Sequence, residues 1–153
     1  MKPVTAAVTV PQAREEVFDF LDVLANHERF TDHFLVDWQL SGPRSGVGAQ
    51  ARMRVKRPGP DDWLDMKVIA AERPRTNVEE SVGAKGRRRT RGTYVLDELP
   101  QGTKITFELV WLEAPLSERL MAPITRSVVG RANAKALRRL VEALASRTKE
   151  ETP

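Results

Sequence analysis

The chain has 153 residues, no cysteine and a formal net charge of +4, and 41% of its residues are hydrophobic while 30% are charged. This length and composition suit a single globular domain with its own core. The lack of cysteine excludes disulfides, thiol nucleophiles and cysteine-based zinc sites. No apolar stretch has the length of a signal peptide or a membrane span, so a cytoplasmic protein is expected.

The first half of the chain predicts a strand, two short helices and three further strands. Apolar residues alternate over 4–10, which is the period of a half-buried strand, and Pro11 ends this strand. Apolar residues at helical spacing predict a short helix from Gln12, and a second short helix or turn is expected over 26–34. The same alternation predicts three more strands, over residues 36–40, 49–56 and 63–71.

The second half predicts three strands and a long terminal helix. The strands are expected over residues 77–82, 90–99 and 104–112. The first of these is weak, and its apolar spacing places Val78, Glu80 and Val82 on the inner side. An amphipathic helix follows from about Leu116 to Ser146, and Pro123 predicts a break near its start.

The order of these elements predicts how they pack. Short turns between the strands favour an antiparallel meander, because parallel neighbours need long crossover connections. The alternation leaves the sheet with one wet and one dry face, and only the terminal helix is long enough to cover the dry face. The sequence therefore predicts one α+β domain over 1–147, with a gap between sheet and helix, and a disordered tail over 148–153.

Four stretches of the chain, in their order and spacing, resemble a known superfamily. They are VTVPQAREEVFDFLDV, SGPRSGVGAQARMRV, GTYVLDELPQGTKITFELVW and RANAKALRRLVEAL. Together they resemble the START-related SRPBCC superfamily, which includes polyketide cyclases/dehydrases, lipid-transfer proteins and birch-pollen-allergen-like proteins. The resemblance implies a helix-grip fold, in which a curved antiparallel sheet of about seven strands wraps around the C-terminal helix and leaves an internal cavity. It implies no particular catalytic residue, because the members share a cavity and not a reaction.

Glu80 and Tyr94 are the candidate catalytic residues, should the protein be an enzyme. A carboxyl group that points inward among apolar side chains has a raised pKa, which would suit Glu80 to act as a general acid or base. The alternative is a register that leaves Glu80 on the wet face, paired with an arginine. Tyr94 should share a face with Gly92 and Leu96, where its hydroxyl group either holds a ligand carbonyl or satisfies one hydrogen bond in the core.

A set of large apolar residues is predicted either to line the cavity or to fill a closed core. The set is Trp38, Met53, Met66, Val68, Val82, Leu96, Phe107, Leu109, Trp111, Met121, Ile124 and Val128. No cofactor or metal is expected, because no nucleotide-binding motif is present and His27 and His33 lack the spacing of a zinc motif. Surface or capping roles are predicted for both histidines.

A cluster of basic residues follows the strand expected over 77–82 and extends into the strand expected over 90–99. Its members are Lys85, Arg87, Arg88, Arg89 and Arg91. The cluster is either a solvated hairpin tip or a surface for nucleic acid or an acidic membrane, and it has no interleaved aromatic residues for base stacking.

Three functions follow from these observations. The leading hypothesis is the binding of a small hydrophobic molecule, similar to a lipid, a polyketide or an aromatic compound, in the cavity. The second is a polyketide cyclase or aromatase that uses Glu80, Tyr94 or a cavity arginine as acid–base groups. The third is an interaction module that uses the basic cluster. The sequence gives no indication of the oligomeric state.

Overall fold

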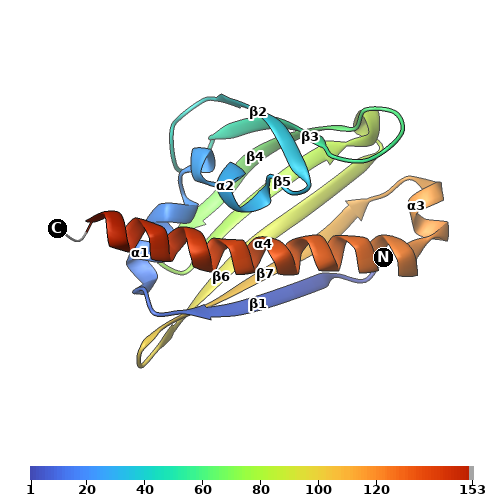
Figure 1. Ribbon diagram of the computed structural model, residues 1–153. Helices are drawn as coiled ribbons and strands as arrows, with labels where there is room; N and C mark the ends of the chain where they lie inside the picture. Colours follow the sequence, from blue (N-terminus) through green and yellow to red (C-terminus); the bar gives the residue numbers. More distant parts are fainter. Residues whose placement is uncertain (152–153) are drawn as a thin grey trace.

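A seven-stranded antiparallel sheet curves around one long helix in the computed structural model, which describes the backbone of residues 1–151 and the side chains of residues 1–149 (Figure 1). The elements, in chain order, are β1 (Val4–Val10), α1 (Arg14–Leu21), η1 (Leu24–Asn26), α2 (Glu28–Thr31), β2 (Leu35–Ser41), β3 (Gln50–Val55), β4 (Trp63–Glu72), β5 (Thr76–Gly83), η2 (Ala84–Gly86), β6 (Arg88–Leu99), β7 (Gly102–Glu113), α3 (Leu116–Leu120) and α4 (Ala122–Glu151).

The strand order is β1-β7-β6-β5-β4-β3-β2, so β2 to β7 form a meander and β1 returns to pair with the last strand. Val4 lies opposite Leu109 and Val10 lies opposite Thr103 in that pair. The two short helices after β1 and the long C-terminal helix complete an α+β helix-grip fold. This confirms the fold class predicted from the sequence.

The core consists of two apolar clusters on the inner face of the sheet. The first lies beneath α1 and the C-terminal half of α4, and it includes Phe18, Tyr94, Leu96, Ile105, Phe107, Leu137, Leu140 and Leu144. The second lies on the side of β2 to β4 and consists of Leu24, Leu35, Ala49, Ala51, Met53, Met66 and Val68.

The terminal helix is divided as Pro123 predicts, because α3 ends at Leu120 and α4 begins at Ala122. Helix α4 continues to Glu151, so the boundary predicted after residue 147 lies within a helix, and the end of the predicted tail, residues 152–153, lies outside the described residues. None of the described helices is long and apolar enough to cross a lipid bilayer.

Candidate functional site

Four buried polar side chains lie together on the inner face of the sheet. Asn77 and Glu79 come from β5, Tyr94 comes from β6, and His27 lies between η1 and α2. Their exposed fractions are 2%, 7%, 5% and 1%. Ionisable side chains are rarely buried to this extent unless they are paired or functional. We call these four residues the inner polar cluster and treat it as the candidate site.

The register of the sheet turns Glu79 inward. Val68 of β4 lies directly opposite Glu79, and Met66 lies opposite Ser81. Residues that lie directly opposite in an antiparallel pair share a face of the sheet. Because Val68 and Met66 are core residues, Glu79 points into the interior.

The inner face predicted for β5 is therefore wrong. Glu80 and Val82 lie on the outer face, opposite Lys67 and Asp65 of β4. The Arg91 guanidinium donates a hydrogen bond to Glu80 Oε1 at 2.7 Å, which is the arginine pair given as the alternative. A short apolar alternation does not decide the face of a strand, since a register shift of one residue turns every side chain to the other side.

Glu79 is a buried carboxyl group without a charged partner. Burial raises its pKa from the ordinary value of 4.5 to about 8. Its Oε2 atom has no hydrogen-bond partner among the described residues and lies 4.0 Å from His27 Nδ1. The carboxyl group is therefore protonated at neutral pH and can donate one hydrogen bond.

His27 places an unprotonated nitrogen beside this carboxyl group. Its Nε2 atom lies 2.7 Å from the Leu21 carbonyl oxygen, which can only accept, so Nε2 carries the proton. Burial lowers the pKa of His27 from 6.5 to about 4. Although His27 and Glu79 lie within ion-pair distance, both are neutral at neutral pH because each charged form would be desolvated.

The surface or capping role predicted for His27 is wrong. The turn between η1 and α2 directs its ring into the interior, where it packs against Phe30 at 5.2 Å and stands edge-on to Tyr94 at 5.9 Å between ring centroids. His33 has a different role, since its Nε2 lies 3.0 Å from the Ala132 carbonyl oxygen and ties the end of α2 to α4.

Tyr94 borders the cluster on the side of β6 and lies on the inner face with Gly92 and Leu96, as the alternation predicts. Its ring packs against Phe107 at 4.6 Å between centroids. Burial and the nearby Glu79 raise the pKa of Tyr94 well above 10, so its hydroxyl group keeps its proton. Gly92 provides the room, because a Cβ atom there would lie 2.7 Å from Phe107 Cζ and 3.2 Å from Glu79 Oε1.

Most of the predicted wall residues lie on the same inner face. The buried ones are Met53, Met66, Val68, Leu96, Phe107 and Trp111. The partly buried ones are Leu109 and Trp38. The structure thus places these side chains on the face that carries the inner polar cluster.

Three predicted wall residues of the terminal helix lie elsewhere. Met121, Ile124 and Val128 are 51%, 57% and 62% exposed. The side of α4 that packs against the sheet continues toward the start of the helix through the half-buried Gly130 and Arg126, which lie against β1 and the residues before it. Val128 is two residues from each of these, about 200° around the helix. The prediction is wrong because the apolar residues at the start of α4 do not determine which side of the helix packs against the sheet.

Two hollows of the structure also lie outside the space predicted for a cavity. The larger one, about 550 Å³, lies among α1, η1, α2, the β2–β3 loop and the C-terminal end of α4. The smaller one, about 260 Å³, lies beside the same loop. Beneath the C-terminal half of α4 the interior is filled by the first apolar cluster. A molecule bound between sheet and helix must therefore displace core side chains.

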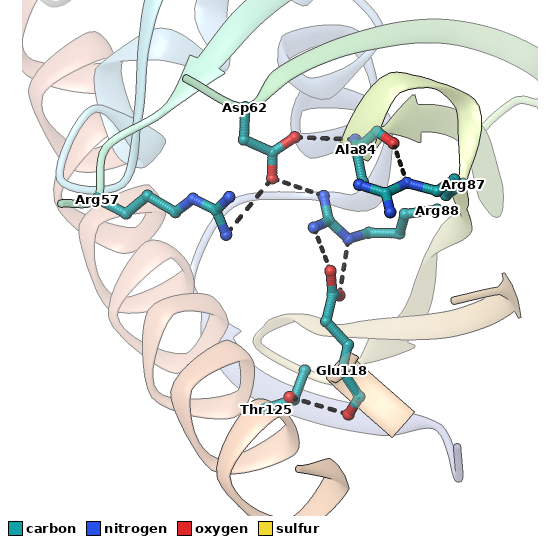
Figure 2. Close-up of polar contacts among 7 residues, drawn as sticks. All are labelled: Arg57, Asp62, Ala84, Arg87, Arg88, Glu118 and Thr125. Atoms are coloured by element: carbon teal, nitrogen blue, oxygen red, sulfur yellow. Dashed lines mark hydrogen bonds and ion pairs between the residues drawn. The ribbon is translucent and has the colours of Figure 1, made fainter. Parts of the chain in front are cut away.

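The basic cluster predicted as a surface patch is split by ion pairs. The Arg88 side chain is only 13% exposed and lies between two carboxylates (Figure 2). Its Nη1 donates to Asp62 Oδ2 at 2.8 Å, and its Nε and Nη2 donate to Glu118 at 2.9 and 2.5 Å. Arg91 pairs with Glu80 on the outer face. The remaining members are exposed: Lys85, Arg87 and Arg89.

The Arg88 network joins three segments that are distant in the sequence. Asp62 precedes β4, Arg88 begins β6 and Glu118 lies in α3, and Asp62 Oδ1 also accepts a hydrogen bond from the Ala84 amide at 3.0 Å (Figure 2). Gly83 provides the space, because a Cβ atom there would lie 2.8 Å from Arg88 Nη1. The network holds α3 against one end of the sheet, and α1 lies at the opposite end (Figure 1).

Sequence reasoning missed Glu79, Asn77 and His27 as site residues. Asn77, Glu79 and Ser81 alternate along β5 and therefore share one face of the sheet. Because all three residues are polar, the sequence pattern predicts that this face points toward solvent. Among the described residues, no group of three or more His, Asp or Glu side chains is placed to hold a metal ion.

No protein-family model matches the sequence, and no curated protein matches it. Solved structures do match. TTHA0849 from Thermus thermophilus is 17% identical, with a TM-score of 0.78 over 95% of this chain and 99% of that chain. Ara h 8.0201 is 14% identical, with a TM-score of 0.60 over 91% and 97% of the two chains. DynU16, a protein in the dynemicin biosynthetic locus, is 19% identical, with a TM-score of 0.63 over 95% of this chain and 48% of its own. At these identities the similarity concerns the fold.

Proposed function

Since this chain has a START/SRPBCC-related fold, we propose that it binds a small, largely apolar and uncharged molecule on the inner face of its sheet. The inner polar cluster orients this molecule, with Glu79 donating a hydrogen bond to a carbonyl or hydroxyl oxygen of the ligand. The surrounding apolar residues supply the affinity by removing ligand surface from water, at about 25 cal/mol per Å².

One observation carries the proposal: buried polar atoms of the cluster have no partner. Glu79 Oε2 and Asn77 Oδ1 are both enclosed and make no hydrogen bond among the described residues. Unsatisfied buried polar atoms are costly and rare in native proteins, and a bound molecule is one of the few explanations for them. Both atoms lie on one face of β5, two residues apart, so one ligand can reach both.

The neighbouring side chains suit such a ligand. Met53 and Met66 belong to the apolar cluster beside Glu79, and unbranched methionine side chains can change rotamer to admit a molecule of irregular shape. A neutral ligand is favoured over an anion, because a carboxylate brought beside Glu79 would lose its hydration without gaining a cation.

The Glu79–His27 pair favours a second function, which is proton transfer in a cyclase-type or aromatase-type enzyme. A protonated carboxyl group and an unprotonated imidazole nitrogen 4.0 Å apart can act as general acid and general base on one substrate. Tyr94 would then polarise a carbonyl group. DynU16, from a biosynthetic locus, is a neighbour in fold that agrees with this function.

Binding of prodan, a neutral naphthyl ketone dye, tests the leading function. We expect a saturable blue shift of its emission with the wild-type protein. Glu79→Leu should weaken binding about tenfold, since one hydrogen bond of about 1.4 kcal/mol is lost. Glu79→Gln keeps a donor and should retain most of the affinity, and the matched control Glu80→Leu removes a carboxylate from the outer face and should retain all of it.

The anionic naphthoate is the second probe and should bind more weakly than prodan. The proposal is contradicted if the wild-type protein shows no saturable prodan binding, or if Glu79→Leu and Glu80→Leu bind prodan equally. The enzymatic function would be favoured if the wild-type protein turns over a poly-keto substrate and both Glu79→Gln and His27→Leu abolish this turnover. Glu79→Gln should then still bind prodan with most of the wild-type affinity.

A further inference from the structure

The larger hollow is lined by residues of α1, α2, the β2–β3 loop and the C-terminal end of α4. Figure 1 shows this end of α4 passing α1. The volume of the hollow, about 550 Å³, lies in the range of small-molecule sites, about 300–1,000 Å³. The function proposed above does not use it, because its lining contains neither Glu79 nor Tyr94.

Two contacts hold the backbone around this hollow in place. Asn26 Nδ2 donates to the Phe20 carbonyl oxygen at 2.9 Å, which holds η1 against α1. Val23 and Ser45 form a β-bridge, which holds the β2–β3 loop against the same turn. The backbone that carries the lining is therefore fixed, while the side chains of Arg29 and Arg44 in the lining are exposed.

Three arginines from three separate elements line the hollow. Arg29 comes from α2, Arg44 from the β2–β3 loop and Arg147 from α4, where its guanidinium lies 5.5 Å from the centre of the Phe20 ring. Within the described part of the chain, Arg29 and Arg44 form no ion pair with a carboxylate. Guanidinium groups that gather around one space repel each other unless an anion lies between them.

The acidic residues of the lining do not balance Arg29 and Arg44. Asp19 accepts hydrogen bonds from Arg73 at 2.8 and 3.1 Å, and these bonds are the main cause of the lowered pKa of Asp19, to which the charge of Arg147 also contributes. Arg73 lies outside the lining. Asp22, which accepts a hydrogen bond from Asn77 at 3.1 Å, is the other carboxylate of the lining beside Arg29 and Arg44.

We propose that this hollow binds a small organic oxyanion, a molecule with a phosphate or carboxylate group, which Arg29 and Arg44 hold. The planar guanidinium fork matches both oxyanions and can donate two parallel hydrogen bonds to either. Val23, which is partly exposed, supplies an apolar contact for the remainder of the ligand. This site shares no residue with the inner polar cluster and adjoins it through the hydrogen bond between Asn77 and Asp22.

Titration of the isotope-labelled full chain with pyrophosphate and with citrate, followed by the amide NMR shifts, tests the site. We expect saturable shifts at 19–29 and 42–46 with at least one of the two probes. The tighter probe identifies the oxyanion as phosphate or carboxylate. Arg29→Gln/Arg44→Gln should weaken binding at least about tenfold, or about 1.4 kcal/mol.

The double variant Arg87→Gln/Arg89→Gln is the matched control, because it removes the same charge from the exposed β5–β6 hairpin. It should bind the probe as the wild type does. Equal weakening in both double variants would show attraction by net charge only and overturn the proposal, as would the absence of saturable shifts with both probes. Glu79→Leu should not change oxyanion affinity, so this site and the proposed function can fail separately.

Discussion

Raising the pH from 6.5 to 8 should lower the free energy of unfolding by about 2 kcal/mol, or about 1.4 kcal/mol per pH unit. The cause is Glu79, whose pKa is about 8 in the folded protein and 4.5 when exposed. In this interval the unfolded chain has released the proton of Glu79 and the folded chain still holds it. Each increase in pH therefore favours the unfolded state.

His27 gives the opposite slope at lower pH. Its pKa is about 4 when folded and 6.5 when exposed, so between these values only the unfolded chain binds the proton. Its contribution to stability is lost as the pH falls through this interval. The slopes of His27 and Glu79 cancel between about 4.5 and 6.5, where stability should be highest.

Urea unfolding followed by tryptophan fluorescence at a series of pH values measures this profile. Glu79→Gln should remove the decline above pH 6.5, because glutamine does not titrate, whereas Glu80→Gln should keep it. If the wild-type protein and Glu79→Gln lose stability in parallel between 6.5 and 8, Glu79 is not a buried neutral acid.

Asp62→Ala should destabilise the protein by about 3 kcal/mol, at the lower end of the range for breaking a buried ion pair. The Asp62 side chain is 2% exposed and accepts hydrogen bonds from both Arg88 and the Ala84 amide. Its removal leaves two partly buried donors without this acceptor. Arg88 keeps its ion pair with Glu118, which limits the loss of stability.

Asp65→Ala is the matched control for this prediction, since Asp65 pairs with Arg52 at a site where both side chains are about half exposed or more. It should change the free energy of unfolding by less than about 1 kcal/mol. Equal effects of Asp62→Ala and Asp65→Ala would contradict the importance of the Arg88 network.

The architecture follows from the sequence because its signals are long and repeated. The short connections between successive strands from β2 to β7 leave little choice of topology, and the alternation of β3, β6 and β7 matches their observed inner faces. Pro123 marks the break before α4 correctly. Each of these signals depends on residues that are close together in the sequence.

The error at Glu80 comes from the apolar residues of β5, because Val78 and Val82 lie on its outer face while Asn77, Glu79 and Ser81 are buried. The bulge in β4 between Val68 and Ala70 does not change this, since β5 pairs with β6 in one unbroken register and buries the same three residues on both sides of the bulge. The inner face of β5 depends on its pairing with both neighbouring strands, so the alternation of one strand does not reveal it.

The roles of His27, Arg88 and the start of α4 also depend on long-range packing. His27 meets Tyr94, and Arg88 meets Asp62 and Glu118, only after distant segments come together. In the sequence His27 is one polar residue in a turn, and Arg88 is one of five neighbouring cations. Local patterns do not distinguish such residues from their exposed neighbours.

The infrared spectrum of the protein with isotope-labelled glutamate, recorded at neutral pH before and after prodan is added, tests the central claim most directly. The account predicts a carbonyl band of a protonated carboxyl group that is absent from Glu79→Gln and moves to lower frequency when prodan binds. A spectrum without that band, or a band that stays unchanged at saturating prodan, would contradict a neutral Glu79 that holds the ligand.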